Sequence, residues 1–404
     1  MQKRYENWIN GLQWDWNISR ERHFGIPIPA WLCEKCHSII LPKENELPID
    51  PIQVKKKCIK CGEYAKPEQK VLDTWATSSL SPQIASSLIK EKVNIPYSLR
   101  PQAHDIIRTW AFYTIVRSYL HQKKLPWNKI MVSGFVKLDG EKMSKSKGNV
   151  INPKKVMLEY GADALRFWAA GSKLGEDLNY QEKDLVAGKR FVTKLLNASR
   201  FVFMNLEDYD GRKPHEFVET DSIFLKNLNI LVSGVTESFQ NYEYSKAKQE
   251  IENFFWKYFC DNYLEIVKYR IYNEKGDKKI SAQYTLYNSL LILIKLIAPI
   301  MPFITEEIYQ TYFKSIEKDK SVHVSNWPQQ HGYREIKDNI WPLILDYIFM
   351  VRKEKASAKK SVKAEIIFYM DKSIMVRLKD VLDDLKAVTN AKEIKEGEFR
   401  VEFI

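Results

Sequence analysis

Hydrophobic and polar positions follow different periods in different parts of the chain. Residues 130–136 read IMVSGFV, a short apolar run with β-branched residues that predicts a buried strand. Residues 84–92 and 106–121 show helical patterns before this strand. In 244–267, apolar residues recur at spacings close to the helical period, within a region from about 181 to 325 that we expect to be mainly helical.

The remaining pattern predicts connectors and a small mixed segment near the end of the sequence. Pro153 after Asn152 marks the start of another helix, because proline is tolerated in the first helical turn. Residues 210–222 and 328–338 are polar and turn-rich, so we expect connectors there. Beyond about residue 340 we expect a helix, a strand at 364–370, a helix at 373–388 and a strand at 399–404.

This order of elements predicts an α/β part, then an all-α part, then a small α+β module. The boundaries that we predict are 1–180, 181–328 and, for the basic C-terminal module, 340–404. The length of 404 residues fits two to three domains, taking roughly 150 residues per domain. We find no internal repeat.

Composition indicates a globular protein with an excess of positive charge. Apolar residues form 45% of the sequence and charged residues 28%, which excludes disorder for most of the chain. Lys and Arg number 63 against 51 Asp and Glu, so we expect a polyanionic partner. No secretory signal is visible, and Lys295 interrupts the most apolar run, 290–298. We therefore expect a core helix there, no membrane association and a cytoplasmic location.

Four of the five cysteines form two pairs with the spacing of a metal site. Cys33-x2-Cys36 and Cys58-x2-Cys61 supply the four thiolates that a structural Zn²⁺ prefers, within knuckles at about 31–65. A redox pair or buried thiols are the alternatives. His37 adjoins the first pair, but four cysteines already complete a closed site. Cys260 lies in an aromatic helical pattern, FFWKYFCDNYL, and is predicted to be core.

A cationic loop follows the predicted strand. Residues 142–146 read KMSKS, in which Lys142 and Lys145 lie three apart among small hydroxyl side chains. Two such cations suit the negative charge that develops on a leaving pyrophosphate. The segment is not a Walker loop, because the sequence contains no GxxxxGK[ST]. The alternative is a basic loop that only contacts solvent.

These residues and their surroundings resemble the class I aminoacyl-tRNA synthetases. KMSKS matches the second signature of that class, and SGFVKLDGEKMSKSKGNVINP with EYGADALRFWAA is similar to the second half of the Rossmann catalytic domain in the valyl, isoleucyl and leucyl subgroup. WDWNISR followed by GIPIPAW is also similar to that subgroup. DTWATSS at 73–79 and RPQAHDIIRTWAFYTIVR at 100–117 resemble the valyl enzymes of archaeal type.

The resemblance implies roles for individual positions. Lys142 and Lys145 would be catalytic, stabilising the ATP phosphates during transfer of the α-phosphoryl group. The positions implied for ATP binding are His104, Asp105, Gly134, Val136, Met143, Ser144 and Ser146. The positions implied for the amino-acid pocket are Trp75, Ile106 and Trp110. A capping or core role is the alternative for His104, and a core role is the alternative for the tryptophans.

The same resemblance implies the substrates, cofactors and partners. They are ATP with Mg²⁺, L-valine and tRNA-Val, together with the structural Zn²⁺. The region 181–325 resembles the anticodon-binding bundle of the family, whose basic helices would bind tRNA phosphates. The C-terminal module contains a group of lysines that could contact tRNA or form a solvated face. They are Lys353, Lys355, Lys359, Lys360 and Lys363.

One signature of the class is missing from this sequence. None of the seven histidines forms HxGH, and the first half of the nucleotide fold and the editing domain are not found either. The sequence thus resembles the C-terminal half of a valyl enzyme, as a fragment or as one subunit of a split enzyme. We expect it to need an N-terminal half that carries HxGH. A non-catalytic tRNA-binding protein, or isoleucyl or leucyl specificity, is the alternative, and DTWATSS disfavours the latter.

Overall fold

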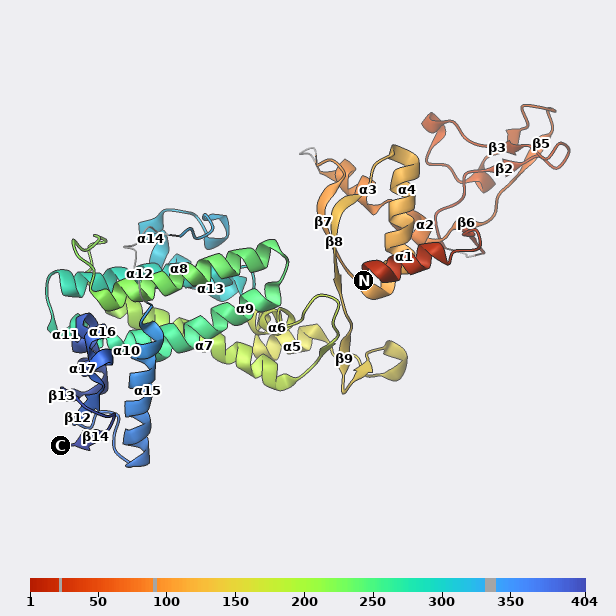
Figure 1. The fold of residues 1–404 in the computed structure, drawn as a ribbon. Coiled ribbons are helices and arrows are strands. Elements are labelled where there is room, and N and C mark those ends of the chain that lie inside the picture. The colour runs from red at the N-terminus through yellow and green to blue at the C-terminus, as the bar shows by residue number, and fades with distance from the viewer. Residues whose placement is uncertain (22–23, 90–92, 331–338) are drawn as a thin grey trace. The chain divides into compact units, whose positions relative to one another are not determined.

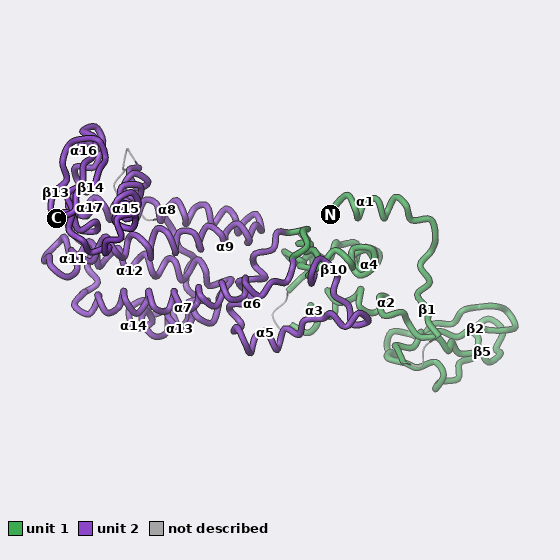
Figure 2. The backbone as a smooth tube through the Cα atoms, turned by 90° about the horizontal axis from the view of Figure 1, so that it is seen from below, with its two compact units in different colours: residues 1–136, 174–178 green, residues 137–173, 179–404 purple. Residues whose placement is uncertain are grey.

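The computed structural model describes residues 1–21, 24–89, 93–330 and 339–404. The chain forms two compact units (Figures 1 and 2). Unit 1 consists of residues Met1–Val136 and Leu174–Leu178, and unit 2 of Lys137–Lys173 and Asn179–Ile404. Each unit is described by itself below.

Unit 1 is built on two parallel strands. β7 (Tyr97–Ala103) pairs with β8 (Trp127–Ser133), and Tyr97 lies opposite Trp127. The connection consists of a 3₁₀ turn, a π-helical turn (Ile107–Ala111) and α4 (Phe112–Gln122), so the helix predicted at 106–121 is confirmed. The unit also contains the helices α1 (Gln2–Asn10), α2 (Thr74–Ser78) and α3 (Ser81–Leu88). A separate two-stranded ladder is formed by β1 (Ser19–Arg20) and β6 (Val71–Leu72). Of the helix predicted at 84–92, residues 90–92 lie outside the described residues.

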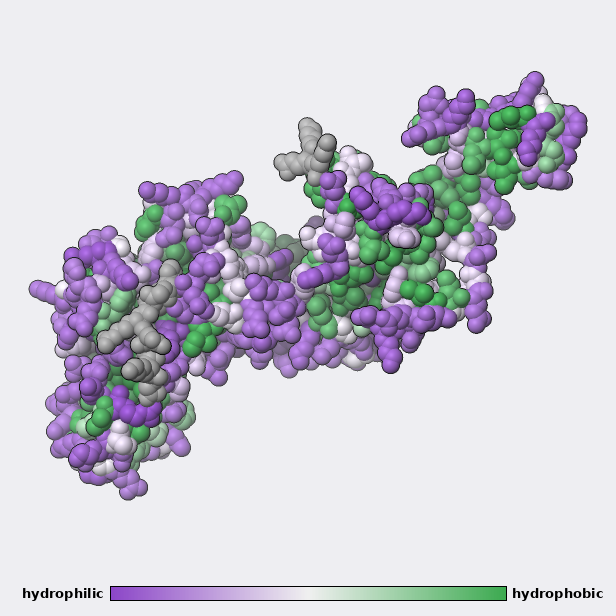
Figure 3. Space-filling model, turned by 45° about the horizontal axis from the view of Figure 1, so that its top comes forward, coloured by the Kyte–Doolittle hydropathy of each residue, from purple (hydrophilic) through white to green (hydrophobic). Residues whose placement is uncertain are grey.

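The strand predicted at 130–136 differs from the structure in its bounds and in its burial. β8 ends at Ser133, and a separate strand, β9 (Val136–Leu138), begins after Gly134 and Phe135. The break is stabilised by segment 174–178, because Asp177 Oδ1 accepts a hydrogen bond of 2.8 Å from Phe135 N. Ile130 is 38% exposed, so the expectation of a buried strand is wrong for this chain. Apolar side chains contribute to the surface of this unit (Figure 3).

Unit 2 begins with a hairpin and continues with helices. β9 pairs with β10 (Glu141–Lys142), in the sheet order β10-β9-β11, where β11 is Leu178–Asn179. α5 begins at Pro153 as predicted, and the Asn152 side chain caps it by accepting a hydrogen bond from Lys154 N. The helices up to residue 317 are α5 (Pro153–Tyr160), α6 (Ala162–Ala169), α7 (Glu182–Met204), α8 (Glu219–Gln240), α9 (Tyr244–Asn253), α10 (Leu264–Ile266), α11 (Lys268–Asn273), α12 (Asp277–Ile297), α13 (Pro302–Ile308) and α14 (Lys314–Glu317). The helical region is therefore confirmed, although α8 already begins within the connector predicted at 210–222.

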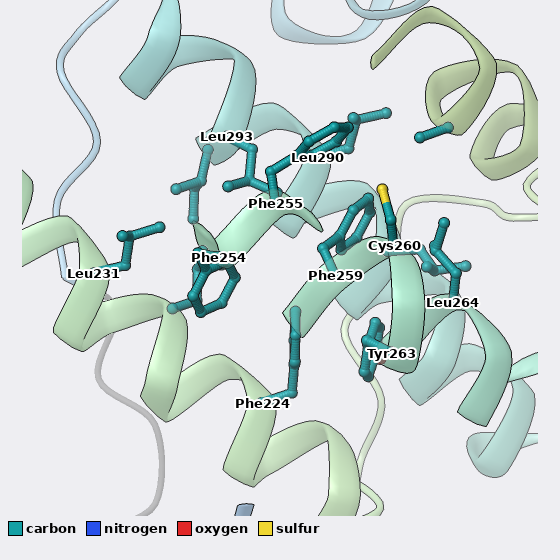
Figure 4. Close-up of a cluster of buried hydrophobic side chains, with 14 of the residues drawn as sticks. Phe224, Leu231, Phe254, Phe255, Phe259, Cys260, Tyr263, Leu264, Leu290 and Leu293 are labelled. Carbon is teal, nitrogen blue, oxygen red and sulfur yellow. The ribbon is translucent and has the colours of Figure 1, made fainter. Parts of the chain in front are cut away.

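Aromatic rings fill the centre of the helical unit (Figure 4). The ring of Phe224 in α8 stacks on that of Tyr263 with centroids 3.9 Å apart. Tyr263 closes a π-helical segment, Phe254–Tyr263, inside the helix predicted at 244–267. Cys260 is buried among these rings, and its burial raises its thiol pKa to about 12. The prediction that Cys260 is a core residue is confirmed.

α12 is long and apolar enough to satisfy a length-and-composition test for a membrane span. Its apolar window is 83% buried inside the unit, which is the environment of a core helix. The helix buries residues around its whole circumference, as expected for one that packs against neighbours on every side.

The C-terminal module combines three described α-helices with a three-stranded sheet. α15 (Trp341–Ser357) precedes β12 (Ile366–Met370), which lies between β13 (Ala391–Glu396) and β14 (Val401–Phe403). β13 runs parallel to β12 and β14 antiparallel to it. A 3₁₀ turn divides the helix predicted at 373–388 into α16 (Lys372–Arg377) and α17 (Leu382–Thr389). β13 was not predicted, and 331–338 of the predicted connector lie outside the described residues.

Lys355 has a structural role in this module. Its ammonium group is buried and donates hydrogen bonds of 2.7–2.8 Å to three carbonyl oxygens, of Val362, Ala364 and Thr389. These acceptors offset the cost of burying the charge. Neither alternative left open for Lys355, a tRNA contact or a solvated face, therefore holds. Lys353, Lys359, Lys360 and Lys363 are exposed.

A buried ion-pair network joins three helices of unit 2. Arg270 in α11 donates to both carboxylate oxygens of Asp221 in α8, at 2.6 and 2.7 Å, and to Asp384 Oδ1 in α17 at 2.9 Å. Tyr263 Oη and Ser281 Oγ also donate to Asp221. Burial alone would lower the pKa of Arg270, but the two carboxylates outweigh it and raise the pKa above its ordinary value.

We predict that Arg270→Met strongly destabilises unit 2. The substitution leaves the buried carboxylates of Asp221 and Asp384 without their cation, and breaking such a pair costs about 3–5 kcal/mol. Urea unfolding followed by far-UV circular dichroism, which reports mainly on this helical unit, measures the loss. Glu265→Gln is the matched control, because it removes an exposed pair with Lys268, and we expect it to shift the transition far less. Equal shifts for the two variants would contradict this account.

Candidate functional site

The KMSKS segment of unit 2 follows a tight hairpin. Asp139 and Gly140 connect β9 to β10 with positive φ angles of 50° and 80°. This is the backbone of a two-residue hairpin turn, for which Asp-Gly is a favoured sequence. Lys142 ends β10 and is exposed, so the hairpin places the first lysine of the segment at the surface.

Side chains within the segment fix its backbone. Asn149 bridges the two ends, because its Oδ1 accepts from Ser144 N at 2.8 Å and its Nδ2 donates to Lys142 O at 3.3 Å. Ser144 also caps the 3₁₀ turn Lys145–Lys147, its Oγ accepting from Lys147 N. Asn149 was missed in the sequence analysis, although its position directly after Gly148 at the end of the turn was a signal for such a role.

The cations of this segment have different environments. Lys147 Nζ forms an ion pair of 2.9 Å with Glu141. Lys142, Lys145 and Ser146 are exposed, and Met143 and Ser144 are half-buried. The structure therefore holds Lys142 and Lys145 at the surface on a backbone fixed by hydrogen bonds. Such an arrangement can bind a polyanion such as a nucleoside triphosphate.

His104 in unit 1 presents an unsatisfied hydrogen-bonding atom directly after β7. Its Nδ1 lies 3.2 Å from Arg4 Nη1, and its ring packs edge-on against Phe135. A guanidinium only donates, so Nδ1 accepts and the neutral ring carries its proton on Nε2. Nε2 is buried without a partner among the described residues. A ligand oxygen could accept this hydrogen bond. Asp105, the next residue, is exposed.

Gly134 is required by the protein itself. A Cβ atom at this position would lie 2.2 Å from Glu176 O, closer than real contacts allow. This contact with the backbone of the protein itself explains the glycine without invoking a nucleotide. Val136, at the start of β9, is exposed.

The predicted pocket residues lie on two adjoining elements of unit 1. Trp110 is buried, stacks on Trp127 and donates from Nε1 to Ser78 O at 3.0 Å. Ser78 ends α2, the helix that contains Trp75, so this hydrogen bond holds α2 against the turn containing Trp110. Trp75 and Ile106 are half-buried. These contacts give Trp110 a structural role, and the pocket role implied by the resemblance stays a prediction.

An ion pair that the sequence analysis missed supports α2. Asp73 Oδ1 caps the helix by accepting from Trp75 N at 2.8 Å, and Asp73 Oδ2 pairs with Arg20 at 2.8 Å. Arg20 ends the WDWNISR motif and Asp73 begins DTWATSS. The available signal was that these two residues of opposite charge each stand at the edge of a motif. The pair connects these motifs across 53 positions of sequence.

The four paired cysteines meet in one cluster of unit 1. Their Sγ atoms all lie within 4.8 Å of one another, and Cys33 Sγ is 3.4 Å from Cys61 Sγ. The cysteines lie in the turns between strands of a four-stranded sheet of order β3-β2-β5-β4. Its strands are β2 (Trp31–Leu32), β3 (Ile39–Ile40), β4 (Lys56–Lys57) and β5 (Tyr64–Pro67). Four sulfurs at this spacing could hold a Zn²⁺ ion and leave no open coordination position.

The two cysteine hairpins share one local geometry. In the first, His37 N donates to Cys33 O at 2.8 Å, and in the second, Gly62 N donates to Cys58 O at 2.9 Å. His37 and Gly62 both adopt positive φ, 55° and 76°. His37 therefore fills the turn position that glycine fills in the second hairpin, and the four cysteines are the candidate ligand set.

Comparisons with known proteins agree with this description. A family model described as "tRNA synthetases class I (I, L, M and V)" matches residues 1–181, and "Anticodon-binding domain of tRNA ligase" matches residues 221–374. The valine–tRNA ligase of Rickettsia felis is 43% identical over 98% of this chain and 48% of its own length. The valine–tRNA ligase of Ehrlichia ruminantium (strain Welgevonden) is 45% identical over 98% of this chain and 49% of its own length.

Solved structures show the same fold at lower sequence identity. Agrobacterium radiobacter K84 LeuRS, in a ternary complex with tRNA and LeuAMS, has a TM-score of 0.63 at 17% identity, over 96% of this chain and 51% of its own. The methionyl-tRNA synthetase of Mycobacterium tuberculosis has a TM-score of 0.54 at 20% identity, over 76% of this chain and 56% of its own.

The fold, the KMSKS segment and both family models place the chain in the class I aminoacyl-tRNA synthetases, to which it belongs. Within that class, the relatives that it resembles over nearly its full length are valine–tRNA ligases. The chain spans about half the length of these curated relatives.

We predict that the purified chain carries stoichiometric zinc on its four clustered cysteines. A Cys33→Ser, Cys58→Ser double variant removes one thiolate from each hairpin, so its zinc content should fall close to zero by inductively coupled plasma mass spectrometry. Cys260→Ser is the control and should keep its zinc, because Cys260 is buried in unit 2. Zinc retained by the double variant, or lost from the control, would refute this ligand assignment.

Proposed function

We propose that this chain supplies the KMSKS-bearing part of a cytoplasmic valine–tRNA ligase. The observation that carries the proposal is the fixed KMSKS segment in a chain 42–45% identical to valine–tRNA ligases. The reaction activates valine with ATP and transfers the valyl group to tRNA-Val. The domain boundaries at 180, 328 and 340 and the cytoplasmic location stay predictions.

In the first step, a valine carboxylate oxygen attacks the α-phosphorus of ATP and pyrophosphate leaves with the bond electrons. Such transfers depend mainly on positioning and charge stabilisation. Lys142 and Lys145 would stabilise the charge that develops on the phosphates, which Mg²⁺ would share when bound with ATP. In the second step, a ribose hydroxyl of tRNA-Val attacks the carbonyl carbon of valyl-adenylate, and AMP leaves.

The other site residues are proposed to bind ATP or valine, and the structure supports some of these roles more directly than others. The buried Nε2–H of His104 would donate to an oxygen of the adenosine. Contacts with ATP are also proposed for Asp105, Gly134, Val136, Met143, Ser144 and Ser146. Trp75, Ile106 and Trp110 would form the wall of the valine pocket. A pocket of this kind rejects larger side chains by size but separates valine from isosteric threonine only about 100-fold.

The proposed activity needs the residues of an HxGH signature, in the same polypeptide or in a separate one. Parallel sheets are normally covered on both faces, whereas the two-stranded sheet of unit 1 leaves Ile130 exposed. Leu120 and Leu125 nearby in sequence are exposed as well. Further strands and helices of the catalytic domain would cover this apolar surface.

We predict that these 404 residues alone do not catalyse valine-dependent ATP–pyrophosphate exchange. Adding an N-terminal half that carries HxGH should restore exchange, because the phosphate contacts of both signatures would then be present. Radiolabelled pyrophosphate incorporation into ATP, with valine, isoleucine and leucine compared, measures activity and specificity. Exchange by the isolated chain would overturn the dependence. No valine activity in the combined protein would favour a non-catalytic role.

In that combined enzyme, we predict that Lys145→Ala lowers kcat of adenylate formation by about 10²- to 10³-fold, the loss typical of one stabilising group in the transition state. Lys147→Ala is the matched control two positions away. It removes a cation that is already paired with Glu141, so its effect should be much smaller. Single-turnover measurement of adenylate formation separates the two variants, and comparable losses would refute the assigned roles.

A further inference from the structure

The first helix of unit 1, α1, lies against the elements that follow β7, although none of its side chains is fully buried. The ring of Tyr5 lies 6.4 Å from that of Phe112, and the guanidinium of Arg108 lies 5.6 Å from the centre of the Trp8 ring. Tyr5 and Trp8 are three positions apart, so they share one face of the helix. Arg4 precedes Tyr5 and lies one turn before Trp8, so the same contacts place it beside the turn directly after β7.

The contact between Arg4 and His104 determines which nitrogen of the histidine ring carries the proton. Arg4 Nη1 lies 3.2 Å from His104 Nδ1. A guanidinium has donors and no acceptor and stays charged in proteins, so it can bind this nitrogen only when the nitrogen is unprotonated. A neutral imidazole can carry its proton on either nitrogen, and the hydrogen bond made by one of them decides between the two forms. Arg4 therefore selects the tautomer in which Nε2 carries the hydrogen.

The orientation of the His104 ring is restricted as well. The ring packs edge-on against Phe135 with centroids 4.1 Å apart, and the preceding strand is paired with β8 as far as Ala103 and Ser133. Nε2 is buried and meets no acceptor in the ranges that the structure describes. Because buried polar groups are nearly always paired, this donor indicates the place of an acceptor that the chain does not supply.

The packing of α1 does not depend on Arg4. Its side chain is exposed, and within the described ranges it forms a hydrogen bond with His104 and no ion pair with a carboxylate. Tyr5 and Trp8 supply the ring contacts of the helix. An exposed arginine adds little to stability, so the effect of Arg4 on the histidine is the better explanation of its position.

We propose that Arg4 is a positioning residue for nucleotide binding. It holds His104 in the tautomer whose Nε2–H donates to an oxygen of the nucleotide. In the other tautomer the lone pair of Nε2 would face the lone pairs of that oxygen, and repulsion would replace the hydrogen bond. This inference rests on the proposed function, because that function places the nucleotide at His104.

The first test measures the tautomer in the full 404-residue chain. Long-range proton–nitrogen NMR spectra of the histidine-labelled protein, at a pH well above the ordinary histidine pKa of about 6.5, separate protonated from unprotonated ring nitrogens. His104→Ala identifies the His104 resonances. We expect an unprotonated Nδ1 in the wild type. In Arg4→Ala this resonance should move toward the protonated position, because both tautomers are then populated.

Lys3→Ala is the matched control for this test. It removes an exposed positive charge from the same helix, next to Arg4, without removing the donor to His104. The Nδ1 resonance should therefore stay at its wild-type position. An unchanged resonance in Arg4→Ala, or an equal shift in Lys3→Ala, would overturn the inference.

The second test measures the consequence for ATP in the combined enzyme that carries the HxGH-bearing half. We expect Arg4→Ala to raise KM for ATP in valine-dependent exchange about three- to ten-fold, the range for loss of one hydrogen bond. The kcat should change little, because this contact is made to the bound nucleotide both before and during the transfer. A KM for ATP equal to that of the wild type would contradict the positioning role.

A double variant shows whether Arg4 acts through His104. His104→Ala removes both the acceptor for Arg4 and the donor to the nucleotide. Adding Arg4→Ala to it should therefore raise KM for ATP no further. If the two effects multiply instead, Arg4 contacts the nucleotide itself and the positioning role is wrong.

These results separate failure of the inference from failure of the proposed function. If the combined enzyme exchanges pyrophosphate and Arg4→Ala keeps the wild-type tautomer, Arg4 does not position His104, while the ligase assignment stands. If the combined enzyme shows no valine-dependent exchange, the proposed function is wrong, and the role of Arg4 in nucleotide binding is wrong with it. Far-UV circular dichroism of each variant confirms that folded proteins are compared.

Discussion

The buried guanidinium of Arg270 is the contact on which the arrangement of unit 2 depends. It lies where α8, α11 and α17 meet and binds a carboxylate from each of the other two helices. It also donates to Lys278 O near the start of α12. A charge can be buried only when its donors are matched by acceptors, so these helices have one relative placement that satisfies the group.

The KMSKS segment is held by a different kind of interaction. It has no hydrophobic core of its own, and its order comes from short-range hydrogen bonds of Ser144 and Asn149 to the backbone. This leaves the lysine side chains exposed while their backbone positions are fixed. A site that binds highly charged phosphates benefits from such an arrangement, because little ordering remains to be done when the ligand arrives.

The sequence predicted most of the helices, the cysteine cluster and the location of the cationic loop, because these depend on local periodicity and spacing. It did not predict β7 or β13. β7 contains Arg100 and Pro101, and β13 reads AKEIKE, so neither shows the alternation of a half-buried strand. Their pairing partners are distant in sequence and supply the stabilisation. Lys355 was misjudged for a similar reason, because its three carbonyl acceptors come together only in the folded module.

The equivalence of the two cysteine hairpins has a consequence for how their module becomes ordered. Each hairpin supplies only two sulfurs, and 21 residues separate Cys36 from Cys58. An ion shared by all four sulfurs would close this loop, and the entropy of closure would then be lost once for both hairpins together. With that ion bound, their ordering would be a single cooperative event, and oxidation of one sulfur in either hairpin would release the other hairpin as well.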